Sequence, residues 1–315
     1  MKRRRFRCPY IKDEKRSLWN ILLWRLGFYD EKKSLPAPPE QFSYPRLSKE
    51  VNPLFPTAMW MGHCTFLISC SGKNILTDPI WSDRCSPIPC YGPKRRHLPP
   101  VSFEDLPRID LILISHNHYD HLDVKTIKKL HRSFPEAVWI VPTGLKKWFK
   151  KRGIEKVNEL FWWEDGKYEG INITAVPGQH FSGRSIFDRN RSLWSGYVVE
   201  FQNKKRFYFV GDTGYNPYDF KSLGEHFKKM DLSLIPIGTY LPRSFMSPVH
   251  VNPQEAVQIH QDVHSTLSIG MHWKTFPLSD EPMNQPPYDL FLAMQEKSLD
   301  PQTFLPLEPG EKVNW

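Results

Sequence analysis

The sequence is poor in cysteine, and the number and spacing of its cysteines exclude two kinds of architecture. The 315-residue chain contains five cysteines, an odd number, and none of them forms a C-x-x-C pair. Neither a disulfide framework nor a zinc site built from cysteine alone is therefore expected. We expect these cysteines to be reduced and packed, which fits a reducing, intracellular setting and a cytoplasmic location.

A long hydrophobic run is also missing near the N-terminus. The apolar segment SLWNILLWRLGF, residues 17–28, is too short to span a bilayer. Charged residues precede this segment and no small-residue cleavage site follows it, so a secretory signal peptide is not predicted. With 40% hydrophobic and 14% aromatic residues, the chain is nevertheless long and apolar enough to bury a sizeable core.

Net positive charge is small outside the N-terminus. Residues 1–33 contain eleven Lys and Arg against four Asp and Glu, so they carry +7 of the net charge of +9. We therefore predict a basic N-terminal extension, residues 1–44, followed by one large domain, residues 45–315. Within the extension, apolar residues of 17–28 recur at helical spacing. This amphipathic segment either packs on the domain or lies on an anionic membrane surface, as a peripheral contact at its inner face.

Short apolar segments separated by turn residues indicate a series of strands. We expect strands within residues 57–63, 65–72, 73–80, 109–116, 137–142, 154–163, 171–178, 195–202, 204–212 and 231–238. Helices are expected over 124–133 and 253–263, and around 146–152 as a basic surface helix with Trp148 and Phe149 facing inward. Because strands and helices alternate in both halves, the predicted fold class is α/β, with two stacked sheets flanked by helices.

The segment LILISHNHYDHLD, residues 111–123, concentrates metal-binding residue types where a buried strand ends. Side chains at i and i+2 of an extended segment point the same way, so His116 and His118 can hold one ion together. Asp120 and His121 follow in the turn, where they can face a second ion. Three imidazoles and a carboxylate within six residues suit zinc, although manganese or iron can share such sites.

Three further candidate ligands follow apolar segments elsewhere in the chain. His180 lies between glycines in VPGQHFSG, Asp212 lies in VGDTG, where glycine permits close approach of the backbone, and His272 follows LSIGM. Taken singly, either histidine is more often an ordinary half-buried side chain. As an ordered set with the motif they give seven ligands, enough for two divalent cations that acidify a bridging water.

Several other polar residues are given supporting or structural roles. We expect Asp78, after the apolar run ILT, to form a turn or to support a ligand, and His63 to act behind the ligands as well. The basic run Lys94–Arg96 is interpreted as a solvated loop.

The chain resembles the metallo-β-lactamase superfamily in the order of its motifs. These are His-x-His-x-Asp-His, then a single His, then Gly-Asp-Thr-Gly, and finally a His near the end of the domain. The segments WMGHCTFLI, ILTDPIWSDRCSPI, GPKR, ISHNHYDHLD, GTYLPRSFM and HVNPQEAVQIH look like its N-acyl-phosphatidylethanolamine-hydrolysing phospholipase D family. The resemblance covers roughly residues 42–280. It implies a four-layer αβ/βα fold, a di-zinc site and a phospholipid substrate, which is cleaved to phosphatidic acid and N-acylethanolamine.

The resemblance also implies a role for each ligand. In that family pattern one zinc would be held by His116, His118 and His180. The other zinc would be held by Asp120, His121 and His272, and Asp212 would bridge the two. His250, in SPVHVNP, matches a family histidine near the substrate phosphate, and we predict that it and Asp120 are catalytic. The alternative for His250 is that it caps the helix predicted from residue 253.

Other functions remain open on the same site. A sugar-phosphate lactonase of the ascorbate-6-phosphate type is the first alternative, and an RNA-processing nuclease is the second. The nearly neutral main domain lacks the broad basic face that an RNA backbone favours, so no nucleic-acid partner is expected. A catalytically silent lipid-binding protein conflicts with the complete ligand set, and the sequence leaves open whether the chain forms a homodimer.

Overall fold

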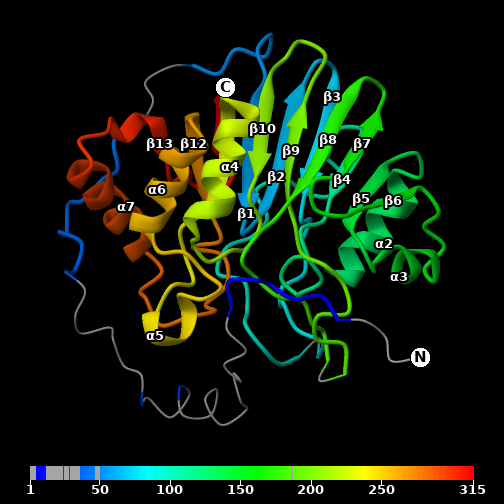
Figure 1. The fold of residues 1–315 in the computed structure, drawn as a ribbon, viewed down its shortest axis with the longest axis horizontal. Helices are drawn as coiled ribbons and strands as arrows, with labels where there is room; N and C mark the ends of the chain where they lie inside the picture. The colour runs from blue at the N-terminus through cyan, green and yellow to red at the C-terminus, as the bar shows by residue number, and fades with distance from the viewer. Residues whose placement is uncertain are drawn as a thin grey trace.

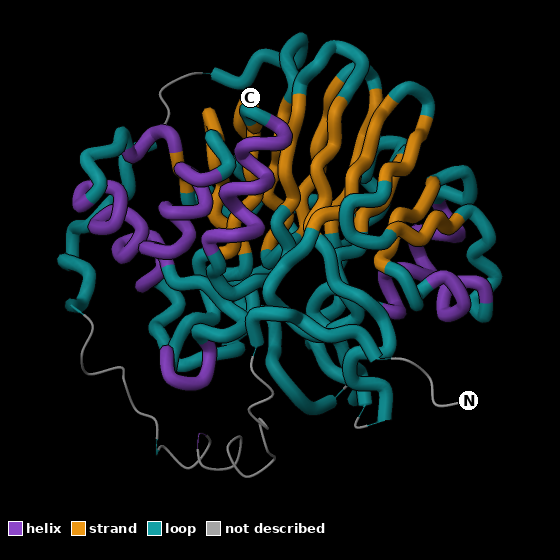
Figure 2. The backbone as a smooth tube through the Cα atoms, viewed as in Figure 1, coloured by secondary structure: helices purple, strands orange, loops and turns teal. Residues whose placement is uncertain are grey.

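Two seven-stranded sheets lie face to face with helices on their outer faces in the computed structural model of the chain (Figures 1 and 2). The structure describes residues 5–11, 24, 28, 36–46, 50–88, 90–185 and 187–315. This arrangement confirms the predicted four-layer fold. Aromatic and branched side chains of both sheets, among them Trp60, Phe66 and Tyr208, fill the space between them.

The first sheet is built mainly from the N-terminal half of the chain. Its strands, in spatial order, are β14 (Lys312–Asn314), β1 (Thr57–Gly62), β2 (Thr65–Cys70), β3 (Lys73–Thr77), β4 (Leu111–Leu113), β5 (Val138–Pro142) and β6 (Val157–Leu160). Strands β3 to β6 run parallel, and β14, β1, β2 and β3 pair antiparallel.

The second sheet repeats this plan with the C-terminal half. Its strands, in spatial order, are β13 (Phe304–Leu305), β12 (Ser265–Met271), β11 (Met230–Pro236), β10 (Arg206–Phe209), β9 (Gly196–Glu200), β8 (Ile171–Val176) and β7 (Asp165–Tyr168). Strands β10 to β13 run parallel, and β7 to β10 pair antiparallel, so β8, β10 and β12 share one direction.

Most of the described helices cover the outer faces of the sheets, whereas α5 (Arg243–Met246) lies on the loop side of the molecule (Figure 1). The others are α2 (Val124–Ser133), α3 (Lys146–Lys150), α4 (Pro217–Phe227), α6 (Pro253–Asp262) and α7 (Gln285–Glu296), with a 3₁₀ turn η2 (Pro301–Thr303). Helix α2 buries Ile127 and Leu130 against the first sheet. Helix α3 buries Phe149 there, as the sequence predicted for its aromatic residues.

Helix α6 begins where the sequence places it because its N-terminus is capped twice. The Asn252 side chain accepts a hydrogen bond from the Glu255 backbone, and the Glu255 side chain accepts one from the Asn252 backbone. This capping box satisfies two of the unpaired N–H groups at the helix start, and Pro253 needs no donor at the first helical position. Helix α7 was not predicted, because its start, QPP, resembles a loop.

The N-terminal extension contacts the domain at several of its described residues. The Trp24 indole donates to Asp280 Oδ2 at 2.6 Å, and its ring stacks on Phe245 at 5.6 Å. Tyr44 donates to the Phe304 carbonyl oxygen at 2.7 Å and belongs to the core. The predicted amphipathic segment 17–28 otherwise lies outside the described residues, and the boundary between residues 44 and 45 stays a prediction.

One edge of the sandwich gathers the ends of strands that run in the same direction. Strand β4 leads into the HNHYDH segment, β8 leads toward His180, β10 toward Asp212 and β12 into His272. The carboxyl ends of parallel strands meet at one edge of a sheet, and here the edges of both sheets lie together. The loops at this edge therefore bring together residues that are more than 150 positions apart in sequence.

Candidate metal centre

The first predicted group of ligands forms a compact triangle of imidazoles. His116 Nε2 lies 2.8 Å from His118 Nδ1, and His180 Nε2 lies 3.3 Å from the same atom. Two nitrogens on one tetrahedral zinc, each at about 2.0–2.1 Å, lie roughly 3.3 Å apart. The three histidines thus have the spacing of nitrogens that share one ion, and they come from both sheets.

The second predicted group lies directly beside the first. Asp120 Oδ2 lies 3.2 Å from His121 Nε2 and 3.5 Å from His272 Nε2. His118 and Asp120 are partly exposed, whereas His121 and His272 are buried. The centre is therefore closed behind the buried ligands and open to solvent along the HNHYDH segment.

Asp212 connects the two groups through a single oxygen. Its Oδ2 atom lies 3.2 Å from Nε2 of both His121 and His272, 3.8 Å from Nε2 of His116 and 3.7 Å from Nε2 of His180. No other carboxylate among the described residues forms such contacts with histidines of both groups. Asp212 therefore lies where a carboxylate bridges two ions.

Three buried polar atoms of this centre have no hydrogen-bond partner among the described residues: His121 Nε2, His272 Nε2 and Asp212 Oδ1. Buried polar groups without partners are rare because their desolvation is not compensated. Cations in this centre would satisfy both imidazole nitrogens and would lie beside the Asp212 carboxylate, so the residues fit a metal ion.

The far side of three of the imidazoles is held so that the near nitrogen faces the centre. His121 Nδ1 contacts Asp78 Oδ2 at 2.6 Å, His180 Nδ1 contacts the Val249 carbonyl oxygen at 3.0 Å, and His272 Nδ1 contacts Thr239 Oγ1 at 3.0 Å. Such outer contacts fix the tautomer and ring orientation of a metal-binding histidine. Asp78 therefore has the supporting place that the sequence predicted.

Charge is distributed unequally between the two groups. Burial lowers the pKa of His118 to about 4 and the pKa of His116 and His180 well below its usual range, so these imidazoles are neutral, the form that binds metals. Burial also opposes charge on His272, but the Asp212 and Asp120 carboxylates outweigh it and raise its pKa to about 9. The two carboxylates thus create a negative potential where a cation would bind.

His63 and His250 flank the centre without belonging to either triangle. His63 Nε2 contacts Asp120 Oδ2 at 2.9 Å, and burial lowers the pKa of this imidazole to about 3. The His250 ring lies 5.2 Å from the His180 ring and 5.4 Å from the His272 ring. The helix cap that was the alternative for His250 is supplied by Asn252, so that alternative is wrong.

Arg184 is a supporting residue that the sequence analysis missed. Its Nη1 donates to the carbonyl oxygens of Asn117 and Leu122, both at 2.8 Å, and its guanidinium lies 3.8 Å from the Tyr119 ring centre. The loop that follows His180 is therefore attached to the loop that carries the motif. No local pattern signals such a contact, since the partners are over 60 residues away.

The solvated loop predicted for Lys94–Arg96 is wrong for Arg95. This residue is only 7% exposed: Nη2 donates to the Ile80 carbonyl oxygen at 2.6 Å, and the guanidinium lies 5.0 Å from the centre of the Phe276 ring. Burial lowers its pKa to about 10. A long arginine side chain can bury its stem when carbonyl oxygens and a ring receive its charged end.

Comparison with known proteins agrees with this geometry. Residues 73–273, which include all seven predicted ligands, match the family model described as the beta-lactamase superfamily domain. The chain is 41% identical over 265 residues to N-acyl-phosphatidylethanolamine-hydrolyzing phospholipase D 1 of Caenorhabditis elegans, which covers 81% of this chain and 74% of that protein. It is 37% identical to the mitochondrial enzyme of that name from Saccharomyces cerevisiae, over 72% of this chain and 49% of that protein.

A solved structure supports the fold independently. The metallo hydrolase Igni18 from Ignicoccus hospitalis superimposes with a TM-score of 0.63 at 21% identity, over 82% of this chain and 98% of that chain. None of the described helices is long and apolar enough to cross a membrane. The chain belongs to the metallo-β-lactamase superfamily, close to its N-acyl-phosphatidylethanolamine-hydrolysing phospholipase D-like branch, and is a metal-dependent hydrolase.

Proposed function

We propose that the protein is a phospholipase D-type phosphodiester hydrolase that uses two zinc ions, with manganese or iron as alternative metals. The observation that carries this proposal is the position of Asp212 Oδ2, within 4 Å of Nε2 of four histidines from both ligand groups. One carboxylate between two imidazole-lined positions is what a pair of ions requires. A single ion would leave one group of ligands unused.

Two bound ions supply electrophilic assistance to a phosphodiester and lower the pKa of a water molecule between them. The protein positions the remaining groups. Asp120, held by His63 and His121, presents a carboxylate that can accept a proton at the open side of the centre. His250 faces the same region and can hydrogen-bond the phosphate or donate a proton to the leaving oxygen.

His250 is held from behind by an ion pair. Arg243 Nη1 donates to the His250 carbonyl oxygen at 3.0 Å, while Nη2 donates to both oxygens of Glu255 at 2.8 and 2.9 Å. Such a two-point contact fixes the plane of the guanidinium. The loop from α5 to α6 therefore carries His250 on a rigid support, as a residue that acts in the reaction requires.

The proposed substrate is an N-acyl-phosphatidylethanolamine, and the products are phosphatidic acid and N-acylethanolamine. Support comes from the similarity to the Caenorhabditis elegans and Saccharomyces cerevisiae proteins named for this activity. We also propose that the protein is cytoplasmic and meets the inner face of a membrane through its basic N-terminal extension, without a nucleic-acid partner.

The test is a direct comparison of substrates on one protein sample of measured metal content. The zinc-loaded protein is expected to turn over N-acyl-phosphatidylethanolamine and to leave a sugar-phosphate lactone and a precursor tRNA intact. Two zinc ions per chain are expected by elemental analysis. Faster turnover of the lactone, or one ion per chain at full activity, would refute the proposal.

The membrane contact needs a truncation that spares the core. Since Tyr44 packs in the core and Gln285 Nε2 donates to the Pro36 carbonyl oxygen, residues 1–35 are the part to remove. The shortened chain is expected to bind anionic liposomes more weakly than the full chain, and more so at low salt. Equal binding by both chains would exclude the extension as the membrane contact.

A further inference from the structure

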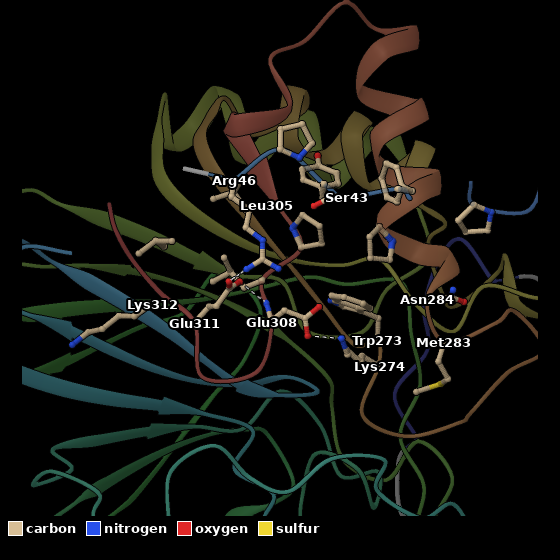
Figure 3. Close-up of a pocket in the computed structure, with 18 of the residues that line it drawn as sticks. Ser43, Arg46, Trp273, Lys274, Met283, Asn284, Leu305, Glu308, Glu311 and Lys312 are labelled. Atoms are coloured by element: carbon tan, nitrogen blue, oxygen red, sulfur yellow. Dashed lines mark hydrogen bonds and ion pairs between the residues drawn. The ribbon is translucent and has the colours of Figure 1, made fainter. Parts of the chain in front are cut away.

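The loop that follows His272, residues 273–283, has no part in the proposed reaction, yet it contacts residues that support the metal ligands. Its two ends line a cavity of about 930 Å³, where Trp273 and Met283 are labelled in Figure 3. Lys274 pairs there with Glu308, as a dashed line in the same figure marks. The start of the loop is therefore attached to the chain between β13 and β14.

Glu281, near the end of this loop, accepts hydrogen bonds from the backbone of another loop. Its Oε1 accepts from the Thr239 amide at 2.6 Å, and its Oε2 accepts from the Leu241 amide at 3.0 Å. The Ser279 hydroxyl also donates to Oε1 at 2.6 Å. Hydrogen bonds from backbone N–H groups to a carboxylate are charge-assisted, and two of them fix both donors at once. One side chain thus holds the start of the GTYLPRSFM segment.

Thr239 has a backbone conformation that needs such support. Its φ is +66°, in the left-handed region that β-branched residues rarely occupy. Residues keep this conformation only where the surrounding structure holds them in it. The preceding residue, Gly238, lies so close to the next strand that a Cβ would be 2.3 Å from the His272 carbonyl oxygen. In this position Thr239 Oγ1 lies 3.0 Å from His272 Nδ1, so Glu281 acts on a ligand through Thr239.

The same loop supports the other side of the second ligand group through Thr275. This residue is fully buried, and its Oγ1 accepts from the His63 amide at 2.6 Å. His63 Nε2 in turn contacts Asp120 Oδ2 at 2.9 Å. In the first group, by contrast, the outer contact of His180 comes from the Val249 carbonyl oxygen. The loop therefore favours one of the two metal positions.

We propose that this loop positions the ligands of the second metal ion, with Glu281 as its main positioning residue. It fixes His272 through Thr239, and Asp120 through His63. The first ion, held by the other three histidines, does not depend on it. The inference rests on the two-ion centre of the proposed function and is independent of the substrate.

The test measures zinc release from the fully loaded protein to a chromophoric chelator. Glu281→Gln keeps the size of the side chain but turns one acceptor oxygen into a donor that faces a backbone N–H. One of the two zinc ions is expected to leave roughly tenfold faster than from the wild type, as the loss of an outer contact predicts, while the other leaves at the wild-type rate.

The matched control makes the same change on an edge strand of the first sheet. Glu159, in β6, accepts a hydrogen bond from the Lys146 backbone N–H, so Glu159→Gln also removes a charged acceptor of a backbone donor. Both ions are expected to leave this variant at wild-type rates. The visible absorption of the cobalt-loaded protein is a second readout, which Glu281→Gln is expected to change and Glu159→Gln to leave unchanged.

A double-mutant cycle separates positioning from a general loss of structure. Thr239→Val keeps the shape of the side chain and removes the oxygen that contacts His272. If Glu281 acts through Thr239, then Glu281→Gln should speed release from the Thr239→Val protein by less than about twofold. A full tenfold effect in that background would overturn the proposal.

Two further results would also overturn it: unchanged release from Glu281→Gln, and equal acceleration of both ions. The outcomes distinguish this inference from the proposed function. A wild type with two ions and unchanged release from Glu281→Gln refutes the positioning role alone, whereas a wild type with one ion refutes both. A protein that shows the expected release but does not cleave N-acyl-phosphatidylethanolamine keeps the positioning role and refutes the proposed substrate.

Discussion

At the scale of single residues, the metal centre depends on side chains that the metal would never touch. His121, His180 and His272 each present one nitrogen inward because an oxygen of Asp78, Val249 or Thr239 holds the other. Such contacts fix the tautomer and the ring orientation of each histidine. They therefore decide whether the seven residues can bind metal as one site. Arg184 acts one step further away, through the backbone of the motif.

Replacing Arg184 by Met is expected to loosen metal binding without unfolding the chain. The change removes donors to the carbonyl oxygens of Asn117 and Leu122, so the loop that carries the motif loses its attachment to the loop after His180. Loss of an outer contact costs roughly 10–100-fold in metal affinity. The rate of metal release to a chelator measures this effect.

A matched control for this substitution lies close by. Arg152→Met also removes a guanidinium that stacks on a ring, 3.5 Å from the centre of Trp148, but Arg152 donates to the Trp148 carbonyl oxygen and not to the motif. Metal release from this variant is expected to match the wild type. The positioning role of Arg184 fails if both variants release metal at the same rate.

His250→Ala is expected to separate catalysis from metal binding. The ring lies beside the two ligand groups, so both ions should remain while turnover falls by about 100-fold or more, the usual contribution of a proton-transfer group. Elemental analysis and kcat are measured on the same sample. The exposed His264→Ala serves as control, and full activity of His250→Ala would contradict the assignment.

At the scale of elements, helices and N-terminal segments hold the loops of the site in place. The described segment 5–11 runs across the loop side of the molecule, where it appears as the dark blue ribbon in Figure 1. The Phe6 amide donates to the Asn190 carbonyl oxygen at 2.8 Å, and the Tyr10 hydroxyl donates to Asp219 at 3.0 Å. This segment thus joins the loop after His180 to the first turn of α4.

Helix α6 packs on strand β12 through a buried histidine, His260, which makes the stability of the fold depend on pH. Burial lowers the pKa of His260 to about 4, and its Nδ1 contacts Ser268 Oγ at 2.8 Å. The unfolded chain, with an ordinary histidine pKa of about 6.5, binds this proton more readily than the folded chain. The stability that neutral His260 contributes is therefore complete above about pH 6.5 and is lost as the pH falls toward 4.

His260→Gln is expected to remove this acid sensitivity while keeping a polar group beside Ser268. Between pH 7 and pH 4 the wild type should lose up to about 3 kcal/mol more unfolding free energy than the variant loses. Urea unfolding at both pH values measures it. Because both proteins lose metal alike in acid, the difference isolates His260, and an unchanged difference would show that His260 is not buried in its neutral form.

At the scale of the whole molecule, the metal centre joins the two sheets. The ligands at 116–121 follow β4 of the first sheet, whereas His180, Asp212 and His272 follow strands of the second. An ion held by both sets cross-links the halves of the sandwich at their open edge. A metal ion that binds only the folded state stabilises that state. The gain in unfolding free energy grows with the logarithm of the ratio of free metal concentration to Kd.

Metal removal is therefore expected to destabilise the whole fold and not just the site. Chelation should lower Tm by roughly 4 °C for each ion withdrawn, the shift expected for a ligand at a hundredfold excess over its Kd and a chain of this size. Differential scanning calorimetry measures it, and zinc should restore the original Tm. An unchanged Tm after complete metal removal would show that the centre does not support the packing of the sheets.

Sequence alone was enough to predict a metal-dependent hydrolase with layered sheets. The types and order of the seven residues, with a strand before each, were enough to predict the metal centre and the α/β layers, because side-chain alternation and ligand preference are local properties. Helix α2 was predicted over the residues it occupies, since Asp123 caps its start and its apolar residues share one face.

Tertiary structure decided everything that depends on distant partners. The resemblance to the family already implied that Asp212 bridges two ions, but only the tertiary structure brings its carboxylate within 4 Å of His116, His121, His180 and His272. Arg95 proved buried, and Arg184 proved attached to the motif, because carbonyl oxygens and rings far away in the sequence receive their charge.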